Sequence, residues 1–197
     1  MRQFSAFGRQ SLVAALRHAG PDSPTLCEGW TARDLAAHIV VRETRPDTGP
    51  GLVLPQVPLL AGWTESVRKR YAKHDYDDLL AEIASGPPSL SPFSLPGVEG
   101  PANLAEFFIH TEDVRRAQPG WHPRDLDAGY ERALWGSLAR SARLLFRDHK
   151  RGVVLVVPDG PRRHVRTGSS TDVITGRPGE LLMYASGRRD HALVEVG

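Results

Sequence analysis

A change of periodicity near residue 150 constrains the fold of this 197-residue chain more than any other sequence feature. Before it, apolar residues recur at helical spacing, whereas residues 152–157 form a Val-rich run that ends at Pro158. Long helices followed by about 45 residues of mixed character predict a mostly α protein. We expect a helical bundle over residues 1–150 and a small α+β extension over residues 151–197. So short an extension can hardly bury its own core, so it is expected to dock on the bundle.

The individual elements follow from the same patterns and from their boundary residues. Thr31 and Asp34 form a predicted capping box at the start of the second helix. The Pro and Gly content of residues 46–51 predicts a loop, and that of residues 86–97 predicts a non-helical crossover. Helices are expected over residues 5–19, 31–44, 59–73, 75–85, 102–118, 125–149 and 178–186, and strands over residues 152–157, 164–167, 172–175 and 192–196.

Composition limits the classes of function. The chain has 25 Lys and Arg against 23 Asp and Glu, a balance that argues against a nucleic-acid partner. Its single cysteine, Cys27, rules out an intrachain disulfide, and we interpret it as a small buried apolar residue. The N-terminus lacks an apolar signal core, and no apolar run approaches the ~20 residues that cross a bilayer. A cytoplasmic protein with no membrane partner is expected.

Three residues are the candidates for a metal site. Glu106 and His110 lie four residues apart in a predicted helix, so both side chains project from one face. His38 follows Leu35, Ala36 and Ala37 in another amphipathic helix and is the best candidate for a third ligand. Facing helices of a bundle assemble metal sites in this way. The alternatives are a surface hydrogen bond between Glu106 and His110 and a hydrogen-bonded core position for His38.

Asp113 and two basic clusters each have two possible roles. Asp113 follows His110 by three residues, so it is either an acceptor that fixes an imidazole tautomer or a partner in a surface ion pair with Arg115 or Arg116. The remaining histidines have no ligand-like neighbour in the sequence. Clusters at residues 161–164 and 188–189 offer positive charge to an anion, although solvated turns are the commoner use of such pairs.

The residues then resemble a known family. Residues 26–38, LCEGWTARDLAAH, and residues 106–117, EFFIHTEDVRRA, are similar to the mycothiol-dependent maleylpyruvate isomerase-like group of the DinB-like superfamily. The resemblance is greatest to an actinobacterial subgroup that is usually described as metal-binding. It implies a DinB-like four-helix bundle that holds a divalent ion, usually zinc, through His38, Glu106 and His110. It also implies mycothiol as the thiol cofactor, and isomerisation or thiol transfer as the reaction.

The chemistry of these ligands agrees with that implication. Two neutral imidazoles and one carboxylate leave a divalent ion with net positive charge and an open position, which is typical of catalytic zinc. A thiol with an ordinary pKa of ~8.5 loses its proton near neutral pH when it coordinates such an ion. Nickel, iron and manganese also accept imidazole and carboxylate ligands.

The leading hypothesis is a metal-dependent thiol transferase or isomerase whose partners are a small-molecule thiol and a small electrophile. The alternative is a non-catalytic metal-binding or ligand-sensing protein of the same fold. A nucleic-acid-binding helical module, suggested only by the arginine content, is a third hypothesis. Bundles of this type often dimerise, so a homodimer is also considered.

Overall fold

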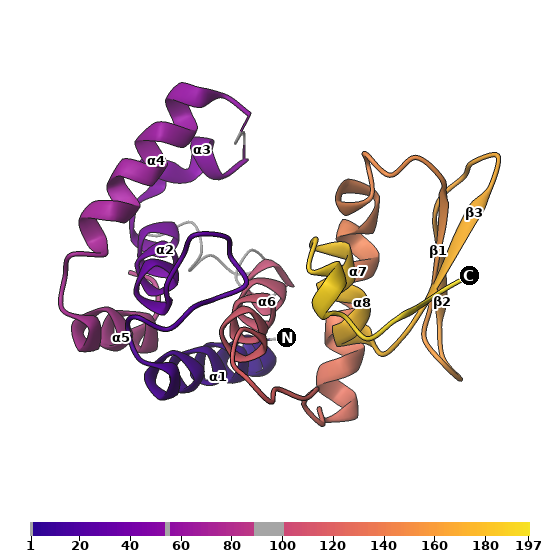
Figure 1. Ribbon diagram of the computed structural model, residues 1–197, viewed down its shortest axis with the longest axis horizontal. Helices are drawn as coiled ribbons and strands as arrows, with labels where there is room; N and C mark the ends of the chain where they lie inside the picture. The colour runs from indigo at the N-terminus through magenta and orange to yellow at the C-terminus, as the bar shows by residue number, and fades with distance from the viewer. Residues whose placement is uncertain (1, 54–55, 89–100) are drawn as a thin grey trace.

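The computed structural model describes residues 2–53, 56–88 and 101–197. It is mostly helical, with one small sheet near the C-terminus, and it confirms the predicted fold class (Figure 1). In the described ranges, no helix is both long enough and apolar enough to span a membrane. The α-helices are α1 (Arg2–Ala19), α2 (Ala32–Thr44), α3 (Gly49–Val53), α4 (Pro58–Tyr71), α5 (Tyr76–Ser85), α6 (Pro101–Arg116), α7 (Ala128–Leu145) and α8 (Pro178–Ala185).

The sheet has four strands in the order β2-β1-β3-β4. The predicted hairpin is present, because β1 and β2 are antiparallel, while β3 runs parallel to β1 and antiparallel to β4. Asp159, in the turn between β1 and β2, has a positive φ of 53°, a conformation that Asp tolerates better than most residues. The strands are β1 (Gly152–Val156), β2 (Arg162–Arg166), β3 (Thr171–Thr175) and β4 (Glu195–Val196).

Helix α6 lies between α2 on one side and α7 and α8 on the other (Figure 1). Its residues belong to two hydrophobic clusters. On one side, its residue Phe107 packs with buried side chains of α1, α2 and α5. On the other side, the next residue, Phe108, packs with α7, α8 and the inner face of the sheet. Adjacent helical residues point about 100° apart, so two consecutive phenylalanines can contact different cores. Both faces of α6 are therefore fixed by packing.

Helix α7 shares its cluster with the C-terminal elements. Leu134 and Leu138 of α7 are fully buried together with Leu155 of β1 and Leu181 of α8. The docking of the extension thus occurs largely on α7 and on one face of α6. The division of the chain into residues 1–150 and 151–197 stays a prediction.

The capping box at the start of α2 is confirmed. The Thr31 side chain accepts a hydrogen bond from the Asp34 backbone N–H, and the Asp34 carboxylate accepts one from the Thr31 N–H at 3.0 Å. Arg68 of α4 also donates to Asp34 at 2.5 Å. These contacts fix the start of the helix that carries His38.

The predicted loop at residues 46–51 is wrong. Residues 46–48 form a 3-10 turn, and α3 follows it directly. Pro46 and Pro50 both occupy first-turn positions, where a missing backbone N–H has no helical partner to lose. Most of the predicted crossover, residues 89–97, lies outside the described residues.

Candidate metal centre

The three predicted ligands come together where α2 faces α6. The Nε2 atom of His38 lies 3.3 Å from Oε1 of Glu106, and Nε2 of His110 lies 3.3 Å from the same oxygen. One donor atom from each of the three residues lies within 4.8 Å of the others. His110 is buried, whereas His38 and Glu106 are half-buried. The i,i+4 spacing aligns Glu106 with His110, and the apolar neighbours of His38 direct its imidazole to the same point.

The donor spacing fits a bound divalent ion. Zinc bonds of 2.0–2.1 Å at tetrahedral angles separate two ligand atoms by about 3.3 Å. Both imidazole-to-carboxylate distances have this value. A direct charge-assisted hydrogen bond is usually shorter, at about 2.7–2.9 Å. The residues therefore match the size and the donor preference of zinc or a similar ion.

Burial and hydrogen bonds shift the pKa values of His38 and Glu106 in opposite directions. Burial lowers the pKa of His38, and the hydrogen bond to Glu106 only partly offsets this. Burial would raise the pKa of Glu106, but hydrogen bonds from His110 and His38 hold it well below its usual value. Glu106 is consequently a carboxylate and His38 a neutral imidazole at neutral pH, which are the protonation states that metal ligands need. Burial would lower the pKa of His110, but its hydrogen bonds with Asp113, Cys27 and Glu106 raise it well above its usual value. A bound metal ion would therefore have to displace a proton from His110.

Asp113 orients His110. Its Oδ2 lies 2.9 Å from Nδ1 of His110, so the imidazole donates from Nδ1 and its Nε2 faces Glu106. Arg188, from the turn after α8, donates to both carboxylate oxygens at 2.8 and 2.7 Å. Burial would raise the pKa of Asp113, but the bonds from His110 and Arg188 lower it to about 2. Of the two predicted roles, the structure shows the acceptor role, and the surface ion pair with Arg115 or Arg116 is wrong.

Cys27 also lies beside this cluster. It packs against the hydrophobic core of α1, α2 and α5, but it is not the fully buried apolar residue that was expected. Its Sγ lies 3.2 Å from Oδ2 of Asp113 and 3.9 Å from Nδ1 of His110, and Nη2 of Arg188 lies 3.6 Å from the sulfur. The thiol is only half-buried. Leu26, beside it, donates its backbone N–H to the carbonyl of Asp113 at 3.0 Å, which ties the loop before α2 to α6.

A cavity of about 490 Å³ opens beside these residues. It lies between the loop before α2 and the turn after α8, and its lining includes Cys27, Trp30, Arg188 and Arg189. The centroid of the Trp30 ring lies 5.2 Å from that of His38, so one wall of the cavity adjoins the ligand cluster. The interpretation of residues 188–189 as a solvated turn is wrong for Arg188, which anchors Asp113.

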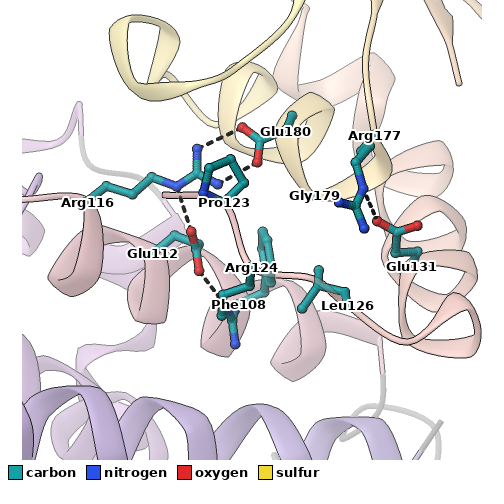
Figure 2. A pocket seen from close by; sticks show the side chains of 10 residues that line it. All are labelled: Phe108, Glu112, Arg116, Pro123, Arg124, Leu126, Glu131, Arg177, Gly179 and Glu180. Atoms are coloured by element: carbon teal, nitrogen blue, oxygen red, sulfur yellow. Dashed lines mark hydrogen bonds and ion pairs between the residues drawn. The ribbon is translucent and has the colours of Figure 1, made fainter. Parts of the chain in front are cut away.

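A buried ion network lies further along α6 (Figure 2). Arg116 donates from Nε to Glu112 at 2.6 Å and makes two bonds, of 2.8 and 2.6 Å, to Glu180 of α8. Arg116 also donates to the backbone carbonyl of His191. The network holds α8, and the turn that carries Arg188, against the helix that carries Glu106 and His110.

One other histidine has a close acidic neighbour that local sequence did not indicate. His149, after α7, lies 2.8 Å from Oδ2 of Asp172 on β3. Arg151 contacts the other carboxylate oxygen at 2.5 Å. The three side chains join the end of α7 to the sheet, which is a structural role.

Comparison with known proteins finds a similar sequence family and similar folds. Residues 9–92 match the family model of the mycothiol maleylpyruvate isomerase N-terminal domain, a range that contains α2 and His38. The predicted family resemblance is confirmed. No curated protein matches the chain.

Two crystal structures of mycothiol-dependent maleylpyruvate isomerase have the same fold. One, of a mutant in which a histidine is replaced by alanine, has a TM-score of 0.66, and the other has a TM-score of 0.57. Each is 16% identical in sequence, and each match covers 100% of this chain and 91% of the other. The likeness therefore extends over the C-terminal elements as well as the isomerase N-terminal domain.

Proposed function

We propose that this chain is a metal-dependent enzyme that activates a low-molecular-weight thiol, mycothiol or a similar compound, for the isomerisation of a small electrophile or for transfer to it. His38, Glu106 and His110 would hold one divalent ion, zinc being the best fit. The convergence of two imidazole nitrogens on one carboxylate oxygen, each at 3.3 Å, carries this proposal. The names of the structurally similar isomerases support the thiol and the reaction class.

The bound ion would supply positive charge that favours the thiolate form of the thiol near neutral pH. The chain's own groups prepare the site for it. Asp113 fixes the tautomer of His110, so that Nε2 is directed at the ion position. Arg188 holds Asp113 from the opposite side and keeps that carboxylate ionised. Glu106 provides the single negative charge among the three ligands.

The cavity beside the cluster supplies the space for the thiol and the electrophile. Its volume of about 490 Å³ falls within the usual range for small-molecule sites. Its lining carries both charges, with Arg188 and Arg189 beside Glu28 and Asp190, and Trp30 contributes an aromatic face. Cys27 also lines the cavity but is not needed as the nucleophile, because the thiol comes from the cofactor.

Metal content tests the ligand assignment. Protein purified without a histidine tag and without added metal should carry about one divalent ion per chain, measured by elemental analysis. His38→Ala, Glu106→Ala and His110→Ala should each lose most of it, because each removes one of only three ligands. His18→Ala is the matched control, since His18 is exposed at the end of α1. Retention of wild-type metal by all three ligand variants would show that the assignment is wrong.

Thiol binding tests the chemistry. Mycothiol added to the cobalt-substituted protein should produce a sulfur-to-metal charge-transfer band in the near ultraviolet, and an analogue without the thiol should not. The band should persist in Cys27→Ala. A band that disappears with Cys27 would identify the protein's own sulfur as the ligand. A metal-loaded protein that shows no band with any thiol, and no thiol-dependent turnover, would be the non-catalytic binding protein instead.

A further inference from the structure

The positive charge of the chain is concentrated in one segment. Residues 140–166 contain eight Arg and Lys but only two Asp, whereas the whole chain has a net charge of only +2. The segment comprises the last turns of α7 and the β1–β2 hairpin. All eight basic side chains are exposed. Such segregation of charge calls for an explanation beyond general solubility.

Part of this surface is concave. A groove of about 410 Å³, here called the cationic groove, lies between the end of α7 and strand β2. Its walls carry Arg143, Arg147, Arg166 and His164, and no carboxylate lines it. Phe146 and Val165, both buried, form an apolar base. The groove shares no residue with the proposed metal centre.

Most of the positive charge in the groove is not neutralised by the protein. Among the described residues, Arg143 has no hydrogen-bond or ion-pair partner. The Arg147 side chain pairs with Asp148, whose side chain is 88% exposed, and such surface pairs contribute little to stability. Arg166 donates to the backbone carbonyl of Arg147 at 2.6 Å, which fixes β2 against the helix end and offsets the negative end of the helix dipole.

Protection of a sheet edge explains only part of this arrangement. Strand β2 is at the edge of the sheet, and charged residues on edge strands prevent pairing with other chains. That need accounts for Arg162, Arg163 and Arg166. It does not account for Arg143 and Arg147, which belong to α7 and to the turn after it and face β2 across the groove. Guanidinium groups that approach from two elements without a carboxylate favour an anionic ligand.

We propose that the cationic groove binds a phosphoryl group with two or more negative charges. Guanidinium groups pair with phosphate oxygens through two parallel N–H donors, and three of them exceed what a single carboxylate needs. The apolar base suits the body of a phosphorylated small molecule. The same chemistry is offered by the phosphates of a nucleic acid, and the basic side chains outside the groove would extend such a contact.

Titration calorimetry of the full chain with inorganic pyrophosphate at low ionic strength tests this site. Arg143→Gln and Arg147→Gln should each weaken binding by about tenfold or more, as expected for the loss of a charge-assisted hydrogen bond. Arg132→Gln is the matched control, because it removes the same charge from an exposed position on α7 outside the groove. His38→Ala should bind pyrophosphate as the wild type does, since the metal centre is elsewhere.

An oligothymidylate titration identifies the source of the phosphate. Binding that is tighter than that of pyrophosphate, salt-sensitive and dependent on Arg143 and Arg147 would assign the groove to nucleic acid, and binding no tighter would assign it to a small phosphorylated ligand. If Arg143→Gln, Arg147→Gln and Arg132→Gln weaken phosphate binding equally, the effect is one of net charge and the proposed site is wrong. Loss of binding in His38→Ala, or no binding of either probe, would also overturn it.

Discussion

Replacement of Arg116 by methionine should strongly destabilise the protein, because this guanidinium neutralises two buried carboxylates. The side chains of Arg116 and Glu112 are each 1% exposed, and that of Glu180 is 9% exposed. The three carboxylate contacts of Arg116 measure 2.6–2.8 Å. In the Arg116→Met variant, Glu112 still has Arg115 and Arg124 as partners, at 3.0 and 2.7 Å. Within the described part of the chain, Glu180 keeps only the backbone N–H of Leu193, at 2.9 Å.

The loss of stability in Arg116→Met comes mainly from Glu180, because Glu112 keeps two arginine partners and Glu180, among the described residues, keeps none. A buried carboxylate that loses its cation costs about 3–5 kcal/mol of unfolding free energy. Removing both partners in Arg116→Met/Glu180→Leu leaves no bare charge at this contact. The double variant should therefore be more stable than the sum of the two single effects implies, with a coupling of about 2 kcal/mol or more.

Urea unfolding followed by circular dichroism measures these free energies. Arg147→Met is the control, because the Arg147–Asp148 pair is exposed, and its loss should cost less than about 1 kcal/mol. A cost for Arg116→Met that is as small as the control, with no coupling to Glu180→Leu, would refute the reasoning. It would show that the network is solvated and does not hold α8 against α6.

Two further predictions concern Asp113 and the C-terminal extension. Because folding lowers the pKa of Asp113 from 3.8 to about 2, its ionised form should stabilise the metal-free protein by about 2 kcal/mol above pH ~4, and this contribution should disappear as the pH falls towards 2. Urea unfolding of the wild type and Asp113→Asn across this range checks it, and a pH-independent difference would contradict it. A chain that ends at Lys150 should keep its metal and its helical circular dichroism but expose Leu134 and Leu138, which increases the binding of an apolar dye. Loss of the helical signal would show that the two parts fold as one unit.

The sequence was sufficient for several features whose signal is local. The capping box of Thr31 and Asp34 lies within one turn, and the strand-turn-strand pattern around Asp159 spans few residues. The same holds for Glu106 and His110, since their i,i+4 spacing alone places them side by side. His38 required a further assumption, that the apolar stripe on its helix faces the stripe on α6, and the structure brings the two helices together in that way.

Contacts made across the chain could not be predicted. Arg188 is 75 residues from Asp113, and Cys27 is 83 residues from His110. The sequence of residues 26–30 does not show where this loop lies, because its path depends on the backbone hydrogen bond from Leu26 to Asp113. The composition rule for loops failed at residues 46–51, because proline in the first turn of a helix loses no hydrogen bond. Both failures concern partners or positions that local periodicity does not encode.

The position of α6 explains how the metal ligands can be held rigidly while the cavity beside them varies between relatives. Phe107 and Phe108 fix this helix against two cores, so the face that carries Glu106 and His110 cannot rotate without disturbing both. The cavity beside them has a different origin, because its walls are the loop before α2 and the turn after α8. Loops on a fixed scaffold tolerate substitution, and they determine which molecules reach the ligands. Relatives with the same helices and different residues at 26–30 and 187–191 should therefore retain metal binding but accept different electrophiles.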